Sequence, residues 1–289
     1  MPNALYRRAG QWAFFALFVL APPLDILRLD LNLGHFIFFG YDWTLGLDAF
    51  QRHEIEGDEA AFRLITRGFL PLLALFGSGA IIAWFYGRLY CGWLCPHFSV
   101  VEMINGCMLR ALGKPSLWER KSLTTKNALW WIPTLVLIFT FAFIWSLSLL
   151  TYLITPTDVY QHLWHAELTR FESLFLSVGT CLFCIEFTFA RHFFCRFGCA
   201  IGLFQSVLWM ANKKAQRVTF ATSRAKACQS CVKACDNTCP MRLKPRGLKR
   251  KMSACTQCTR CIDACQEVQM DNPSRALLSW RKGNQPPEK

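Results

Sequence analysis

Two runs of four cysteines near the C-terminus constrain this chain more than any other feature. The first run spans residues 228–239 with the spacing C-x2-C-x3-C-x3-C, and Pro240 follows it. The second run spans residues 255–265 with the spacing C-x2-C-x2-C-x3-C, which is typical of segments that ligate 4Fe–4S clusters. Thiols at this spacing wrap a tight loop round one corner of an iron–sulfur cube, so that backbone amides point at the sulfurs. The first run is the same pattern with one extra residue before its third cysteine.

The tandem arrangement predicts which cysteines share a cluster. In two-cluster chains the fourth cysteine of each run ligates the cluster held by the other run. Zinc sites usually take four ligands in pairs separated by a longer spacer, and disulfides need an oxidising compartment. We therefore predict two 4Fe–4S clusters as cofactors. Their ligand sets are Cys228, Cys231, Cys235 and Cys265 for one cluster, and Cys239, Cys255, Cys258 and Cys261 for the other.

Apolar stretches ahead of these runs predict a membrane protein. The chain has 289 residues, of which 53% are hydrophobic, and a net charge of +13. A helix that spans a bilayer needs about 20 mostly apolar residues, and four stretches meet that requirement. We expect the first stretch to be retained, and to kink or end at Pro22 and Pro23. The four predicted spans are Gln11–Leu29, Gly68–Gly87, Ala128–Ile154 and Phe171–Ala190.

The basic residues between these stretches predict the topology, because they concentrate on the cytoplasmic side of a membrane. Residues 30–67 contain three basic and seven acidic residues, whereas residues 191–289 contain nineteen basic and five acidic residues. We therefore expect both termini and the clusters in the cytoplasm. The predicted fold is a mainly α-helical membrane protein, with a four-helix membrane domain over residues 1–212 and a small two-cluster ferredoxin-like domain over residues 213–289.

The second and fourth predicted spans end alike. The sequence after the second span is Arg88-Leu-Tyr-Cys91-Gly-Trp-Leu-Cys95-Pro96, and the sequence after the fourth is Arg191-His-Phe-Phe-Cys195-Arg-Phe-Gly-Cys199-Ala200. Each copy places an arginine and an aromatic residue before a Cys-x3-Cys motif. Since both copies leave the membrane on the same side, we predict two helix pairs repeated in parallel orientation, which brings the four cysteines together. These membrane-face cysteines are Cys91, Cys95, Cys195 and Cys199.

Three kinds of chemistry are open to four converging thiols. They could hold a further iron–sulfur centre, bind soft Cu(I), or cycle between dithiol and disulfide. Free cysteine is also a good buried packing residue, but the matched flanks favour a redox or metal role. His97 directly follows Cys95-Pro96 and is a candidate additional ligand. We expect the three other cysteines, which have no such partners, to be ordinary buried residues: Cys107, Cys181 and Cys184.

Further polar residues suggest partners. His162 and His165 lie three residues apart, a spacing that suits metal binding or proton transfer from a quinol, and also a surface pair without such a role. The basic run over residues 244–251 predicts attraction to anionic lipid rather than to nucleic acid. A basic face of this kind could also dock an acidic electron carrier.

The motifs together resemble the membrane polyferredoxins of bacterial respiration. The resemblance covers nearly the whole chain: predicted spans, Cys91-x3-Cys95-Pro96 after the second, Cys195-x3-Cys199 after the fourth, then tandem cluster runs. That group includes the quinol dehydrogenase membrane subunit of periplasmic nitrate reduction (NapH), the membrane half of the nitrous-oxide reductase regulator, the methylamine-utilisation ferredoxin-type proteins and the cbb3-oxidase accessory protein (CcoG). Ala200 stands where this family often has proline.

The resemblance implies an integral protein of the bacterial inner membrane that transfers electrons. Its partners would be membrane lipid, quinone and redox proteins on either side of the membrane, with no nucleic acid. We expect electrons to pass between a quinol pool or outer-face partner and the cytoplasmic clusters. Two alternatives stay open: an accessory factor that reduces copper during cofactor maturation, and a regulator that senses redox state. In addition to the two tail clusters, the membrane-face cysteines would hold a further iron–sulfur centre or copper.

Overall fold

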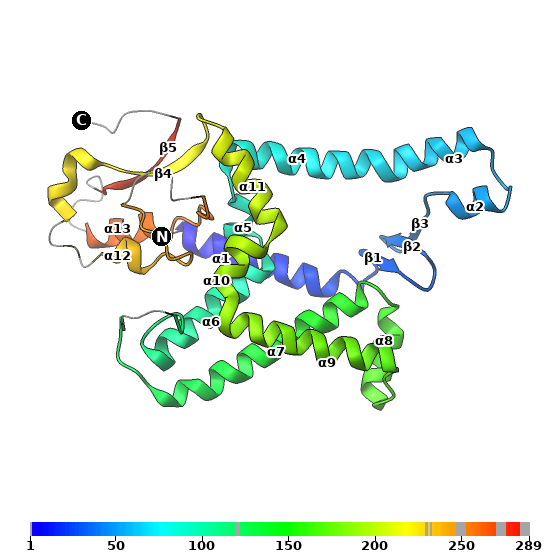
Figure 1. Ribbon diagram of the computed structural model, residues 1–289, viewed down its shortest axis with the longest axis horizontal. Coiled ribbons are helices and arrows are strands. Elements are labelled where there is room, and N and C mark those ends of the chain that lie inside the picture. Colours follow the sequence, from blue (N-terminus) through cyan, green and yellow to red (C-terminus); the bar gives the residue numbers. More distant parts are fainter. Residues whose placement is uncertain are drawn as a thin grey trace. The chain divides into compact units, whose positions relative to one another are not determined.

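The computed structural model of this protein describes residues 2–118, 122–228, 231, 233–246, 253–269 and 276–283. It is mostly helical and divides into two compact units (Figure 1). Unit 1 comprises Met1–Phe15, Ala80–Leu135 and Phe189–Lys289, and unit 2 comprises Ala16–Gly79 and Val136–Thr188. Most of the basic run predicted to attract lipid, residues 247–251, lies outside the described residues.

Three helical segments are long and apolar enough to cross a membrane within the described part of the chain. The first combines α3 (Gly57–Arg63), η1 (Leu64–Phe69) and α4 (Leu70–Tyr86). The other two are η2 with α7 (Ala128–Trp130 and Trp131–Thr151) and α9 with η3 (Arg170–Ile185 and Glu186–Ala190). They overlap three of the four predicted spans, and these three candidate spans are consistent with a membrane protein.

The remaining predicted span, Gln11–Leu29, is not a single helix. Helix α1 covers Pro2–Leu20, and strand β1 already begins at Leu27 and ends at Asp30. The helix ends just before Pro22 and Pro23, whose ring nitrogens lack the N–H that a continuing helix needs. The helix is also shifted toward the charged N-terminus, so its apolar part is shorter than the prediction required.

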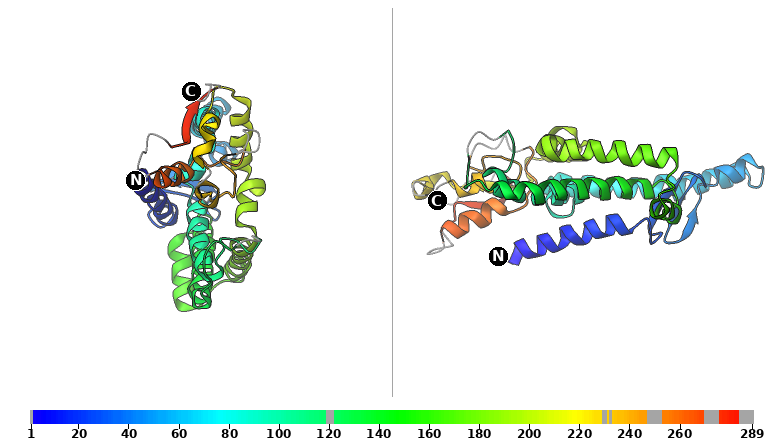
Figure 2. Two further views of the ribbon diagram at one scale, coloured as in Figure 1. Left: turned by 90° about the vertical axis from the view of Figure 1, so that its left-hand side faces the viewer. Right: turned by 90° about the horizontal axis from the view of Figure 1, so that it is seen from below.

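Unit 2 is built from helices and a small sheet. Strands β1, β2 (His35–Phe38) and β3 (Tyr41–Trp43) form an antiparallel sheet in that order, followed by α2 (Leu47–Gln51). Helices α7 and α9 run side by side (Figure 2), where the hydroxyl of Ser146 lies 2.9 Å from the position that a β-carbon on Gly179 would take. Helix α8 (Pro156–His165) connects them over an apolar cluster formed by Leu150, Val159 and Leu176.

Unit 1 contains both Cys-x3-Cys motifs and the cysteine-rich tail. Helices α5 (Leu89–Trp93) and α6 (Pro96–Leu112) carry the first motif, and α10 (Arg191–Phe193), η4 (Phe194–Gly198) and α11 (Ala200–Ala211) carry the second. Cys95 and Cys199 occupy the same local position, since each is the extended residue immediately before a helix, α6 or α11. The two Cys-x3-Cys motifs are therefore alike in local backbone, while the parallel repeat of two helix pairs stays a prediction.

The tail folds around a two-stranded ribbon. Strand β4 (Gln216–Phe220) pairs antiparallel with β5 (Leu278–Lys282), with Val218 opposite Trp280. Between the strands lie η5 (Thr222–Cys228), α12 (Ala234–Asn237) and α13 (Arg260–Val268), and the last two are neighbours (Figure 1). The ribbon thus brings both ends of the described tail together and encloses the cysteine runs.

Candidate functional site

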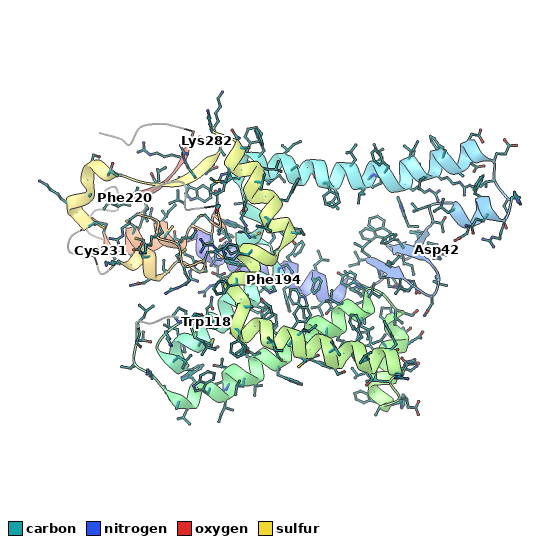
Figure 3. The ribbon with its side chains drawn as sticks, in the orientation of Figure 1. Asp42, Trp118, Phe194, Phe220, Cys231 and Lys282 are labelled. Carbon is teal, nitrogen blue, oxygen red and sulfur yellow. The ribbon has the colours of Figure 1, made fainter. Side chains whose placement is uncertain are left out.

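Two cavities in the tail are each lined by four cysteines. Cavity A has Phe220 and Leu278 on its wall, and cavity B has Val218 and Met241 (Figure 3 labels Phe220 and Cys231 of cavity A). The cysteines are Cys228, Cys231, Cys235 and Cys265 in cavity A, and Cys239, Cys255, Cys258 and Cys261 in cavity B. The fold therefore groups the thiols in the two sets predicted from the tandem runs. The first three cysteines of each run line one cavity, and the fourth lines the cavity that holds the first three cysteines of the other run. That these groups ligate clusters stays a prediction.

The donors around cavity B suit sulfur ligands of an iron–sulfur cluster. The backbone N–H of Leu243 donates to the Sγ of Cys239 at 3.4 Å. Backbone N–H groups of Gln257 and Arg260 point at the sulfurs of Cys255 and Cys258, respectively. Gln257 and Thr259 both have positive φ, and such turns direct successive N–H groups to one side. Hydrogen bonds of this type offset the negative charge of cluster thiolates.

The surroundings of these thiols keep a bare sulfur protonated. Desolvation raises the pKa of Cys255 to about 12 and that of Cys258 to about 11, although neighbouring N–H groups oppose the shift. A thiolate in such a cavity needs a bound cation in place of the proton. Iron bound in cavity B would therefore displace protons from these cysteines.

Cavity A has its own polar support. The N–H of Leu277 donates to the Sγ of Cys265 at 3.4 Å, and a guanidinium nitrogen of Arg246 lies 3.9 Å from the Sγ of Cys228. Arg246 also pairs with Asp236 at 2.6 Å, and this hydrogen bond is the main reason that the pKa of Arg246 is raised. The described wall of cavity A comes entirely from tail residues between Phe220 and Leu278.

The membrane-face cysteines converge only in part. Desolvation raises the pKa of Cys95 to about 12, and the nearby thiols of Cys91 and Cys199 contribute to the increase. The Sγ of Cys195 instead lies 3.5 Å from Nδ1 of His97, while the thiol of Cys91 is 3.4 Å from Oε1 of Gln205. Three of the four thiols therefore influence one another, and the fourth contacts the histidine suggested as a ligand. In the described ranges, no three or more Cys, His, Asp or Glu side chains are placed to hold a metal ion.

The first Cys-x3-Cys motif packs directly on the loop of cavity B. A β-carbon on Gly92 would lie 2.2 Å from the carbonyl oxygen of Thr256, so only glycine permits this approach. The indole N–H of Trp93 donates to the carbonyl of Gln257 at 3.2 Å. The residues between Cys91 and Cys95 thus contact the residues between Cys255 and Cys258.

An apolar cluster extends the same contact. Cys195 of the second motif is buried with Phe98 of α6 and with three tail residues: Met241, Leu243 and Ala254. Three cysteines pack against this cluster, namely Cys95, Cys239 and Cys255. Cysteines of both membrane-face motifs and of cavity B therefore pack in one apolar cluster of unit 1.

A largely buried carboxylate that the sequence patterns did not single out, Glu102, joins three segments of unit 1. Oε2 of Glu102 accepts hydrogen bonds from Arg7 at 2.7 Å and Gln11 at 3.0 Å, and Oε1 pairs with Arg260 at 2.9 Å. Burial alone raises the pKa of Glu102, but the two guanidiniums and the amide of Gln11 outweigh burial and hold the pKa below its usual range. Arg7 and Gln11 also donate to the carbonyl of Gly92.

The remaining singled-out residues lie in different surroundings. Nδ1 of His162 is 3.1 Å from both carboxylate oxygens of Glu172, whereas His165 is exposed. The two histidines therefore differ in both exposure and contacts, and a shared role stays a prediction. Cys107 and Cys184 are partly buried, but Cys181 is exposed on α9, so the prediction of a buried packing residue is wrong there.

Comparisons with known proteins point to iron–sulfur chemistry. Residues 69–115 match the model of a 4Fe–4S binding domain, a segment that contains Cys91 and Cys95 but not the tail. An uncharacterized protein of Methanocaldococcus jannaschii is 24% identical over 188 residues, which cover 63% of this chain and 70% of that protein. The candidate electron transport protein YccM of Escherichia coli is 20% identical over 64% of this chain and half of its own length. No solved structure matches. These matches support an iron–sulfur protein of the ferredoxin type.

Proposed function

We propose that this chain is an integral-membrane electron-transfer protein of bacterial respiration. It passes electrons between a quinol pool, or a redox partner on the outer face, and two 4Fe–4S clusters in its cytoplasmic tail. The observation that carries the proposal is the contact of Gly92 with Thr256, because it joins a membrane-face motif to the loop that lines cavity B. The description of the E. coli relative as a candidate electron transport protein supports the same role.

The two cavities suggest an order of contacts. When bound, each cluster takes up and releases one electron at a time. Cys239 and Cys255 of cavity B pack against the apolar cluster that contains Phe98 and Cys195, whereas no described cysteine of cavity A belongs to that cluster. We therefore assign cavity A to exchange with a soluble partner and cavity B to exchange with the membrane side. The backbone amides and apolar walls position the sulfurs and exclude water.

The proposal is tested on full-length protein purified without oxygen. We expect about eight iron and eight sulfide per chain from the tail, from two clusters of four irons each. Reduced clusters should give an electron paramagnetic resonance signal. Adding a quinol analogue to oxidised protein should produce this signal, or adding a quinone to reduced protein should remove it. The Cys258→Ser variant should lose iron, and the control variant Cys107→Ser, which changes a cysteine outside both cavities, should not. Colourless protein with zinc in place of iron would contradict the proposal.

A second candidate function is copper reduction during cofactor maturation. The contact of Cys195 with His97 favours it, because a thiol beside an imidazole offers the donors that copper accepts. Reducing equivalents from the tail would then reduce Cu(II) to Cu(I), one electron per ion. Anaerobic titration with Cu(II), followed by a Cu(I)-specific chelator, tests this function. Cu(I) formation that is lost in His97→Ala while the quinol reaction is unchanged would support it.

A further inference from the structure

A third cavity in unit 1, of about 370 Å³, lies where the end of a candidate span meets the tail ribbon. Its size falls within the range of small-molecule sites, about 300–1,000 Å³. The last two residues of α4 contribute exposed aromatic side chains, Phe85 and Tyr86. The tail contributes the rest of the described lining (Figure 3 labels Lys282), which consists of Lys214, Gln216, Lys282 and Gly283.

The walls of this cavity are held together by contacts with α11. The side-chain amide of Asn212 donates to the carbonyl of Trp84 at 2.9 Å. Gly87 ends α4 with a φ of 65°, and a β-carbon there would lie 2.7 Å from the ring of Trp209. The indole N–H of Trp209 donates to the carbonyl of Gln216 at 3.0 Å. The end of the span and the start of strand β4 are therefore both fixed to the same helix, so the cavity between them is a built feature of the fold.

The tail side of the cavity is positively charged. Gln216 of β4 lies opposite Lys282 of β5, and paired residues present their side chains to the same face of a ribbon. Lys214 precedes Gln216 by two residues and lines the same cavity. Neither the described lining nor strands β4 and β5 contain an acidic side chain. Two ammonium groups thus meet at one cavity without a carboxylate beside them, which favours an anionic ligand.

The span side of the cavity indicates what kind of anion fits. Aromatic residues at the end of a membrane span lie at the level of the lipid headgroups, and α4 ends in Trp84, Phe85 and Tyr86. Ile81 lies one turn before Phe85 on the same face of the helix, and both side chains are exposed. Apolar surface therefore continues from the cavity along the span. A ligand that uses both sides has an anionic head and an apolar tail.

We propose that this cavity binds the headgroup of an anionic phospholipid. The phosphate lies at Lys214 and Lys282, and the acyl chains follow the face of α4 that carries Ile81 and Phe85. The bound lipid attaches the tail ribbon to the bilayer at a site distinct from cavities A and B. This role goes beyond electron transfer and does not depend on it, because none of the lining residues is a cysteine.

The test measures lipid binding to full-length protein in a neutral detergent. Native mass spectrometry counts bound lipid during titration with phosphatidylglycerol, with zwitterionic phosphatidylcholine or with inorganic phosphate. Wild type should bind one phosphatidylglycerol in preference to the other two. Lys214→Gln/Lys282→Gln should weaken this binding about 30-fold, about fivefold for each charge removed. Lys214→Arg/Lys282→Arg keeps both charges and should retain it.

The matched control is Lys213→Gln/Lys226→Gln. It removes two exposed charges from the same tail, but neither residue lines the cavity, so binding should stay at the wild-type level. An equal loss in the two glutamine pairs would show attraction to diffuse tail charge and would overturn the proposal. Equal binding of the two lipids would also overturn it. Inorganic phosphate that binds as tightly as phosphatidylglycerol would reveal a site for a soluble anion instead.

Two further results keep the test decisive. If the glutamine pair at Lys214 and Lys282 does not fold, the arginine pair decides: retained lipid supports the proposal, and lost lipid overturns it. Failure of the proposed function looks different from failure of this inference. Protein without iron that still binds phosphatidylglycerol contradicts electron transfer alone, whereas protein with full iron content that binds no lipid contradicts the lipid site alone.

Discussion

Gly92 lies against Thr256 so closely that a β-carbon on residue 92 would meet the carbonyl oxygen of Thr256 at 2.2 Å. The two residues are far apart in the chain, and each sits between two cysteines of a different motif. Their contact fixes the loop of cavity B on the first membrane-face motif. If the tail were attached to the rest of unit 1 only through its linker, Gly92 and Thr256 would not be in contact.

We expect Gly92→Ala to loosen this contact. The added methyl group meets backbone, which cannot swing aside like a flexible side chain, so overpacking should cost about 1–3 kcal/mol. Thermal unfolding and limited proteolysis of the tail measure the effect. The matched control is Gly106→Ala on α6, where an added β-carbon meets nothing within 4 Å. That control should be neutral or slightly stabilising; equal behaviour of the two variants would contradict the packing argument.

Glu102→Gln should destabilise unit 1 strongly. The side chain of Arg7 is 4% exposed, and the substitution leaves its charge without a carboxylate. Removing one partner of a buried ion pair costs about 3–5 kcal/mol. The control is Glu59→Gln, whose 2.6 Å pair with Arg63 is exposed and should contribute about 0.5 kcal/mol or less. Chemical denaturation of both variants checks the contrast, and a loss below 1 kcal/mol in Glu102→Gln would refute it.

The same carboxylate should make the free energy of unfolding depend on pH in the acid range. The pKa of Glu102 is held below its usual value of about 4.5, so the folded protein binds fewer protons at this group than the unfolded chain does. Its contribution to stability is therefore present above about pH 4.5 and lost as the pH falls through the folded-state pKa. Melting temperatures of wild type and Glu102→Gln, compared between neutral and acid pH, should converge as the pH falls. A constant difference across that range would rule out the linkage.

Much of the architecture follows from local patterns. The three candidate spans are recognisable in the sequence by their length and apolar composition. The tandem spacing of the cysteine runs groups the tail cysteines in the same two sets that line the two cavities. These features depend on residues close together in the chain, or on a general rule for paired cluster runs. The first predicted span, Gln11–Leu29, was wrong in its bounds: the helix ends next to Pro22 and Pro23, as the prolines indicated, but it begins at Pro2 and the residues after the prolines form a turn and strand β1.

Features set by distant contacts were not predictable. Glu102 is a single acidic residue in an apolar helix, and nothing near it in sequence reveals its partners Arg7 and Arg260. The role of Gly92 likewise depends on a neighbour in the tail. The arginines before the two Cys-x3-Cys motifs were visible as a repeat, but only the fold shows that Arg88 is enclosed and reaches Cys195.

The exchange of the fourth ligand between the two cysteine runs gives a final prediction. Cys235 and Cys265 line cavity A, whereas Cys239, close to Cys235 in sequence, lines cavity B. The double variant Cys235→Ser/Cys265→Ser should therefore lose about four of the eight tail irons and keep one cluster signal. The double variant Cys235→Ser/Cys239→Ser changes two cysteines as well, but it alters both cavities and should lose both clusters. Iron counting with electron paramagnetic resonance separates the two results. If instead each run held its own cluster, the adjacent pair would abolish one cluster and the distant pair both, because the grouping of the thiols by cavity would then have no bearing on ligation.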